Sequence, residues 1–285
     1  AEETAQDLDG DIVILHTNDV HGAISGYAKV AALKDAYEAR GAYVLLMDAG
    51  DFIQGDPTVS TSEGATAVEL MNLAGYDVAS MGNHEFDYGY QNLKDLEADA
   101  DFTIVDANVL YNGQVAFEDN VVFTAPDGTK IGVFGLDTPE TATKAHPAKI
   151  QGVTFMAKDE LYNFATQEAA ALKKGGADVV IALTHLGVDE ESNPNRSTDL
   201  YARSTGIDFI IDGHSHTVMT EGENKEPIQS TGTALENVGV IVIDNATKKI
   251  EKNELVKLEG VKAEDETVKA LADKIITDVD TRLGE

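Results

Sequence analysis

The chain has 285 residues, of which 42% are hydrophobic and 25% charged, a composition that is typical of a folded protein and excludes extended disorder. Its 51 acidic residues outnumber 21 basic ones, and the formal charge of −30 argues against nucleic-acid duplexes and anionic lipid surfaces as partners. Cysteine is absent, so any bound metal must be held by nitrogen and oxygen atoms. No apolar run approaches the roughly 20 residues that span a bilayer, so membrane insertion is not expected.

The first half of the chain alternates short apolar strands with amphipathic helices. Strands are expected at residues 11–17, 43–47, 77–80 and 102–105, and helices at residues 26–40, 63–73 and 90–96. In the first of these helices, Val30, Leu33 and Tyr37 share one face, and Gly41 provides a stop signal. Strands that are separated by helices need crossover connections, so most of them should pair in parallel.

The second half begins and ends with expected hairpins. The first joins residues 121–124 to 131–136 through the turn-rich sequence PDGTK, and the second joins 238–244 to 249–257. Between the hairpins we expect a helix at 157–174, a strand at 177–183, a polar loop at 187–198 and a strand at 207–211. The fold class is therefore α/β, with two sheets packed between helices.

The two ends of the chain are expected to lie outside this domain, which spans residues 11–260. Residues 1–10 form a tail that is either a mature end left after signal removal or a boundary cut from a longer chain. Residues 261–285 form a last helix with Val268, Leu271, Ile275 and Val279 on one face. That helix either packs on the domain or leads to a further domain.

Five segments with unusual polar residues each follow a predicted strand. They are HTNDVHG at 16–22, DAGDFIQGD at 48–56, GNHEFD at 82–87, LTHLG at 183–187 and DGHSH at 212–216. Taken singly, each has an ordinary explanation, such as a helix cap or a tight turn. Six of the seven histidines nevertheless fall in these segments, and the carboxyl ends of strands in an open α/β sheet form one crevice. We therefore expect a single site.

The side chains of these segments are suited to divalent cations. Two carboxylates, one amide oxygen and four imidazoles are available for two cations, one carboxylate bridging both. The candidate ligands are Asp19, His21, Asp51, Asn83, His185, His214 and His216.

The order of DVH, GD, GNHE, TH and GHSH resembles the calcineurin-like metallophosphoesterases, and HTNDVHG and GNHEFDYG are similar to the 5′-nucleotidase and 2′,3′-cyclic phosphodiesterase branch. The resemblance covers residues 11–260, which it identifies as a catalytic domain. It implies a four-layer α/β/β/α sandwich with two mixed sheets and a dinuclear metal centre, with zinc or manganese as the first choice. It places Asp19, His21 and His216 on one metal, places Asn83, His185 and His214 on the other, and makes Asp51 the bridge.

The resemblance also implies roles for the remaining polar residues of GNHEFD. His84 faces the substrate phosphate and stabilises the transition state while water activated by the metals attacks, and Asp87 orients the His84 ring. Glu85 belongs to the motif without a defined role. At the position of His216 the branch often has an amide residue, which bears on the choice of metal.

The expected activity is hydrolysis of phosphate esters, with nucleoside 5′-monophosphates as the leading substrates. Alternatives are 2′,3′-cyclic nucleotides, nucleotide sugars or dinucleotides, thiosulfate esters, or a surface binding module without catalysis. Only four arginines are present, at 40, 196, 203 and 282, and none lies in a motif. In this branch a separate C-terminal domain holds the nucleoside, and we expect such a domain to be missing here. The resemblance also implies a protein that is secreted, attached to the cell surface or periplasmic.

Overall fold

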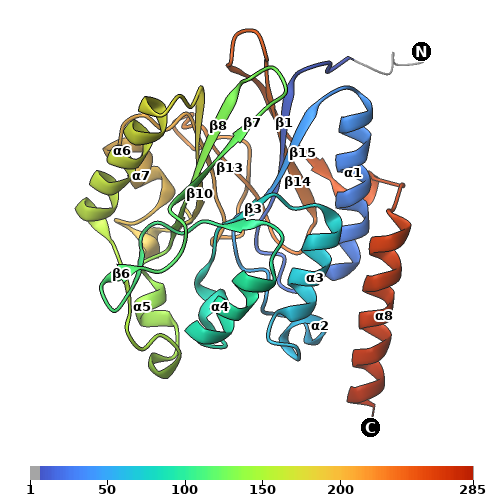
Figure 1. Ribbon diagram of the computed structural model, residues 1–285. Helices are drawn as coiled ribbons and strands as arrows, with labels where there is room; N and C mark the ends of the chain where they lie inside the picture. The colour runs from blue at the N-terminus through green and yellow to red at the C-terminus, as the bar shows by residue number, and fades with distance from the viewer. Residues whose placement is uncertain (1–6, 285) are drawn as a thin grey trace.

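The computed structural model describes residues 7–284, so residues 1–6 of the expected tail lie outside the described part. Two six-stranded mixed sheets lie face to face in the middle of the molecule, and helices cover their outer faces (Figure 1). The predicted α/β class with two mixed sheets is confirmed. None of the described helices is both long enough and apolar enough to cross a membrane.

The first sheet has the strand order β15-β14-β1-β2-β3-β4, and these strands span Ile250–Lys257, Asn237–Ile243, Ile12–Thr17, Tyr43–Asp48, Val78–Ala79 and Thr103–Ile104. The strands β1 to β4 pair in parallel, as the alternation of strands and helices predicted. The strands β14 and β15 form the predicted second hairpin, and β14 pairs with β1 in antiparallel orientation.

The second sheet has the order β12-β13-β11-β10-β8-β7, and its strands span Val218–Met219, Ile228–Thr231, Phe209–Ile211, Val179–His185, Lys130–Asp137 and Asn120–Thr124. Its four inner strands are parallel, and an antiparallel strand lies at each edge. The strands β7 and β8 form the predicted first hairpin.

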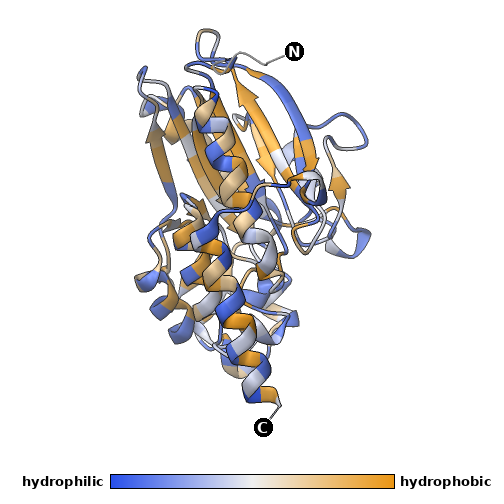
Figure 2. Ribbon diagram, turned by 90° about the vertical axis from the view of Figure 1, so that its right-hand side faces the viewer, coloured by the Kyte–Doolittle hydropathy of each residue, from blue (hydrophilic) through white to orange (hydrophobic). Residues whose placement is uncertain are grey.

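The alternation of side chains along β1 explains why the sheets form layers. Ile12 and Ile14 face the second sheet and join the core between the sheets, whereas Val13 and Leu15 face the helices. The helices over the first sheet include α1, α3 and α8, at Tyr27–Ala39, Ala65–Ala74 and Glu266–Leu283. The outer face of the second sheet lies beneath α6 and α7, at Lys158–Lys174 and Ser197–Arg203. Figure 2 shows the corresponding pattern, with largely hydrophobic strands and helices striped by hydrophobic and polar residues.

The last helix, α8, packs against α1 and α3. Val268, Ala272, Ile275 and Val279 are buried in this contact, and Leu271 is half-buried. The helix therefore has the packing role that its apolar face allows. Its role as a connector to a further domain stays a prediction.

Short elements differ most from the sequence-based expectation. A three-stranded sheet with the order β6-β5-β9 was not predicted, and neither were the helices α2 and α5; the bounds are Gln114–Val115, Val109–Tyr111, Val153–Phe155, Pro57–Ser60 and Thr141–Lys144. The prediction of a polar loop up to residue 198 is wrong at its end, since α7 begins at Ser197. Elements of two to four residues are too short to show a periodicity, so contacts with the rest of the fold determine them.

Candidate active site

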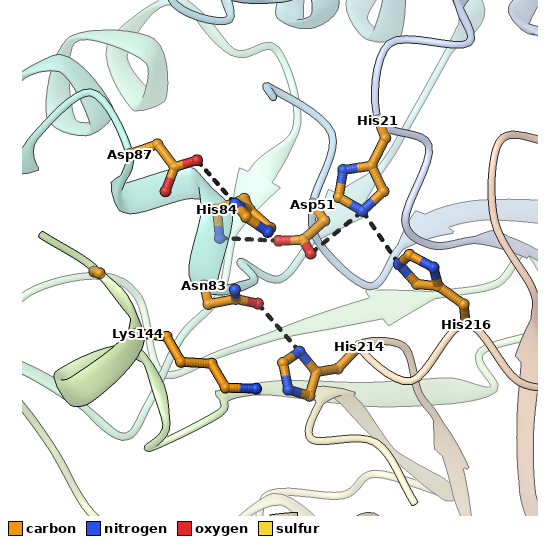
Figure 3. Close-up of a pocket in the computed structure, with 9 residues that line it drawn as sticks. His21, Asp51, Asn83, His84, Asp87, Lys144, His214 and His216 are labelled. Carbon is orange, nitrogen blue, oxygen red and sulfur yellow. Dashed lines mark hydrogen bonds and ion pairs between the residues drawn. The ribbon is translucent and has the colours of Figure 1, made fainter. Parts of the chain in front are cut away.

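The five polar segments converge at the carboxyl ends of the strands, as predicted. A pocket of about 400 Å³ is lined by seven of the nine predicted site residues: His21, Asp51, Asn83, His84, Asp87, His214 and His216 (Figure 3). The other two, Asp19 and His185, are fully buried and contact the pocket residues. Segments separated by almost 200 residues thus form one site.

The backbone of the site is held in an unusual conformation. Asp19, His21, Asp51, His214 and His216 have φ angles of 52°, 49°, 62°, 77° and 54°. Residues other than glycine rarely adopt this left-handed conformation, which costs roughly 1–3 kcal/mol for each residue. Such strain persists where surrounding contacts over-determine the geometry, which is common at functional sites.

Hydrogen bonds between the loops hold these strained residues. The backbone N–H of Asp19 donates to the carbonyl of Gly50 at 2.9 Å, and that of His21 donates to the carbonyl of Asp51 at 3.1 Å. Across the two sheets, the backbone N–H of His214 donates to Asp19 Oδ2 at 3.0 Å. The loops therefore position one another.

Three side chains meet on one side of the pocket. Asp19 Oδ1 lies 3.7 Å from His21 Nε2 and 3.4 Å from His216 Nε2, and these two nitrogens are 3.3 Å apart. The other ring nitrogen of His21, Nδ1, lies 3.2 Å from the carbonyl oxygen of Gln54. When Nδ1–H donates to that carbonyl, the lone pair of Nε2 points toward Asp19 and His216.

A second group surrounds Asp51. His185 Nε2 lies 3.1 Å from Asp51 Oδ2 and 3.7 Å from Asp19 Oδ1, and His185 Nδ1 is 2.6 Å from the carbonyl oxygen of Ala49. The amide oxygen of Asn83 lies 3.1 Å from His214 Nδ1. Asp51 is thus near ligand atoms from both groups, which is the position that a bridging carboxylate needs.

These donors fit divalent cations. Asp19 Oδ1 and His185 Nε2 are buried polar atoms that have no hydrogen-bond partner among the described residues. Two sets of three residues have candidate ligand atoms that lie within 4.8 Å of one another inside each set. One set is Asp19, His21 and His216, and the other is Asp19, Asp51 and His185. Nitrogen and oxygen donors that converge in this way suit zinc, manganese and similar ions.

The buried charges of the site interact strongly. Burial opposes a charged His185 ring, but the carboxylates of Asp51 and Asp19 outweigh it and raise the His185 pKa well above its ordinary value. Burial likewise opposes a charged Asp51, yet His185 lowers the pKa of that carboxyl. A divalent cation bound here needs Asp51 ionised and His185 neutral, so it would take the place of the His185 proton.

His84 and Asp87 contact each other at the rim of the pocket. His84 lies in η2, the 3-10 turn Asn83–Phe86, and its Nδ1–H donates to Asp87 Oδ2 at 2.8 Å (Figure 3). This hydrogen bond raises the His84 pKa, in spite of the opposing effect of burial. A histidine with this partner can carry a proton near neutral pH.

The structure defines what Glu85 contacts, which the sequence motif did not. Its fully buried carboxylate accepts backbone N–H groups from four residues: Asp51 at 2.8 Å, Phe52 at 2.7 Å, Ile53 at 3.3 Å and Gly82 at 2.5 Å. Burial raises the Glu85 pKa to about 7, and the charge of Asp51 adds to this effect. Glu85 thus ties the loop of Asp51 to the turn of His84. An acidic residue in the first turn of a helical segment is the sequence pattern that could have indicated such a role.

Two further residues were missed. Lys144 lines the pocket, and Glu140 lies between Lys144 and His214. Nζ of Lys144 is 2.6 Å from Glu140 Oε2, and Glu140 Oε1 is 3.5 Å from His214 Nε2. The contact with His214 is the main cause that lowers the pKa of Glu140 to about 2. The strand expected at residues 131–136 ends close to Glu140, but no metal-ligand motif follows it. The sequence therefore offered no signal for these two residues.

Comparison with known proteins identifies the family. Residues 12–218 match the family described as calcineurin-like phosphoesterase. The chain belongs to the calcineurin-like phosphoesterase family. This confirms the resemblance that was drawn from the motifs, and it makes the domain a phosphoester hydrolase by family.

Relatives of this phosphoesterase include named nucleotide hydrolases. It is 31% identical to the trifunctional nucleotide phosphoesterase protein YfkN of Bacillus subtilis, over 76% of this chain and 17% of that protein. It is 32% identical to a 5′-nucleotidase of Vibrio cholerae, over 79% of this chain and 44% of that protein. The chain therefore spans less than half the length of either relative.

A solved structure supports the architecture. The crystal structure of calcineurin-like phosphoesterase YfkN from Bacillus subtilis matches with a TM-score of 0.82 at 25% identity. The match covers 96% of this chain and 99% of that one. The predicted metallophosphatase fold is thereby confirmed.

Proposed function

We propose that this domain hydrolyses phosphate esters with the help of two divalent cations, and that nucleoside 5′-monophosphates are its substrates. The observation that carries the proposal is the convergence of buried Asp19 Oδ1 and His185 Nε2, which have no hydrogen-bond partner among the described residues, beside a pocket that also contains His84. Asp19, His21 and His216 would hold one cation. Asn83, His185 and His214 would hold the other, with Asp51 shared.

The bound cations, His84 and Glu85 would have different roles in the reaction. Bound divalent cations supply Lewis acidity toward the phosphoryl oxygens and lower the pKa of water, so that hydroxide is available near neutral pH. His84, protonated with the help of Asp87, donates a hydrogen bond to a phosphoryl oxygen or a proton to the leaving oxygen. Glu85 keeps the loop of Asp51 and the turn of His84 in register, because it accepts backbone N–H groups from both.

The nucleoside part of the substrate would be held elsewhere. Among the residues that the structure describes, those that line the pocket include no arginine and no phenylalanine or tyrosine that could stack on a base. We propose that a domain outside this sequence holds the nucleoside. The partial coverage of the relatives supports this, and the likeness to a snake venom 5′-nucleotidase of Gloydius brevicauda supports action outside the cell.

A second candidate is a broader range of nucleotide esters that includes 2′,3′-cyclic nucleotides. The observation in its favour is the likeness to a protein named a trifunctional nucleotide phosphoesterase. The contrasting hypothesis is a binding module without catalysis. Substitution of His84 distinguishes the two, because only an enzyme would lose activity.

The test uses His84→Ala with His146→Ala as the matched control. His146 is exposed, lies in a nearby loop and is absent from the pocket lining. With manganese or zinc added, the parent chain should hydrolyse p-nitrophenyl phosphate but process adenosine 5′-monophosphate poorly. His84→Ala should lower kcat by about 10²–10⁴, with the metal content measured by elemental analysis unchanged. Equal rates for His84→Ala and the control would contradict the role of His84.

A further inference from the structure

Lys144 is the single lysine or arginine among the described residues that line the pocket. Figure 3 shows its side chain extending from α5 along the wall of the pocket, with the ammonium beside the ring of His214 and below Asn83. In a protein with an excess of 30 negative charges, one ammonium beside the candidate metal ligands is an unexpected feature. It is also a group that the family motifs in the sequence did not predict.

The position of Lys144 is set by rigid parts of the fold. The helix α5 follows directly after β8 and packs against η2, the turn that carries His84, and against β9. Thr141, at the start of α5, is fully buried, and its hydroxyl donates to the carbonyl of Thr138 at 2.7 Å. The ammonium is therefore presented from an anchored helix at the wall of the pocket.

The present partners of Lys144 leave it able to bind a ligand. Its Nζ lies 2.6 Å from Glu140 Oε2 and 3.3 Å from Glu191 Oε1. An ammonium has three N–H donors, so at least one remains for a ligand in the pocket. The side chain of Glu191 is 68% exposed, and an exposed pair of this kind is weak and readily displaced.

Glu140 connects Lys144 with the candidate metal centre. One of its oxygens contacts the ammonium, and the other lies 3.5 Å from Nε2 of His214, whose Nδ1 faces Asn83. The same carboxylate thus positions a pocket cation and a candidate metal ligand. The ammonium lies on the side of the pocket where Asn83 lies, and both residues line it (Figure 3).

We propose that Lys144 binds an oxygen of the substrate phosphoryl group and makes the site selective for phosphate monoesters over diesters. A monoester carries a charge of about −1.5 to −2 at neutral pH, whereas a diester carries a single negative charge and has one fewer terminal oxygen. An ammonium that contacts the extra oxygen stabilises only the bound monoester. The inference rests on the proposed function and adds to it the residue that distinguishes monoesters from diesters.

The contrasting explanation is that Lys144 only links α5 to the turn at Glu191 by ion pairs. In that case its removal would change both ester classes equally, through a small disturbance of the loop. The two explanations differ in selectivity, so the ratio of two rates separates them.

The experiment compares p-nitrophenyl phosphate with bis(p-nitrophenyl) phosphate, which have the same leaving group. The variants are Lys144→Ala, Lys144→Arg and, as matched control, Lys149→Ala, which changes an exposed lysine outside the pocket lining. A hydrogen bond between charged groups predicts that Lys144→Ala lowers kcat/KM for the monoester by roughly tenfold to a hundredfold. The diester rate should fall much less, Lys144→Arg should retain the monoester preference, and Lys149→Ala should match the parent chain.

Inorganic phosphate gives a readout that does not depend on turnover. Calorimetry on the manganese-loaded protein should show weaker phosphate binding by Lys144→Ala, in the same proportion as the loss of monoester activity. Equal losses for both esters, or unchanged phosphate affinity, would overturn the inference. If the parent chain hydrolyses neither ester, the proposed function fails, while the phosphate affinities still decide the role of Lys144.

Discussion

The two sheets contribute different chemistry to the two walls of the pocket. The loops after β1, β2 and β3 supply Asp19, Asp51 and His84, and their carboxylates are buried and bound by backbone N–H groups. The loops of the second sheet supply imidazoles and the Glu140–Lys144 pair; His185 is fully buried there, whereas the side chain of His216 is 46% exposed. The first wall is thus built on buried carboxylates, while the second wall ends at a rim where His216 and Lys144 are partly exposed.

This difference indicates where substitutions will be tolerated. A buried carboxylate with several N–H donors leaves those donors unpaired when it changes, and this is costly in a low-dielectric interior. A half-exposed imidazole can be replaced by another neutral donor with little loss, because water compensates. The buried carboxylates of the first wall should therefore be sensitive to substitution, and the exposed rim of the second wall at His216 should be tolerant.

The largest effect is expected for Glu85→Gln, which tests the rigidity of the first wall. The amide group would direct N–H donors at backbone N–H groups that now donate to the carboxylate. Leaving buried donors unpaired costs about 1–3 kcal/mol each, so the free energy of unfolding should fall by about 2–5 kcal/mol. Urea unfolding measures this, with Glu38→Gln, an exposed site on α1, as control. A loss of unfolding free energy equal to that of Glu38→Gln would contradict the sensitivity of the first wall.

A smaller effect is expected for His216→Gln, which tests the tolerance of the second wall. Glutamine offers an amide oxygen near the place of His216 Nε2, 3.4 Å from Asp19 Oδ1. Because an amide oxygen can also bind a divalent cation, manganese affinity should fall by less than about tenfold, the low end of changes around a metal ligand. Titration of manganese, monitored by calorimetry, measures this affinity. A loss well beyond a hundredfold would show that this wall is as strict as the first one.

The smallest effect on rate is expected for Asp87→Asn, at the exposed rim of the first wall. The carboxylate of Asp87 raises the His84 pKa, and activity that needs protonated His84 is lost as the pH rises through that pKa. Removing the charge lowers the His84 pKa, so the alkaline limb of the pH–rate profile should move to lower pH. An ion pair this exposed is worth about 1 kcal/mol at most, so kcat at neutral pH should fall no more than about fivefold. An unmoved alkaline limb would remove Asp87 from the control of His84.

Much of the site could be predicted because its residues follow strands. The ends of parallel strands meet at one edge of a sheet, so motifs after β1, β2, β3, β10 and β11 could be placed together without coordinates. The roles of Asp19, His21, Asp51, Asn83, His185, His214 and His216 as ligands stay predictions, although the structure brings all of them to one pocket. Lys144 could not be predicted, because nothing in its local sequence reports that α5 packs on the turn of His84.

The sequence by itself determined the order of the longer strands and helices and the polar residues at the strand ends. Both follow from local periodicity and from the position of each residue just after an apolar strand. Only the tertiary structure decided that Glu85 joins two loops, that Glu140 lies between Lys144 and His214, and that a third, short sheet forms. These features depend on contacts between residues that are far apart along the chain, and the free energy of such contacts leaves no pattern in the local sequence.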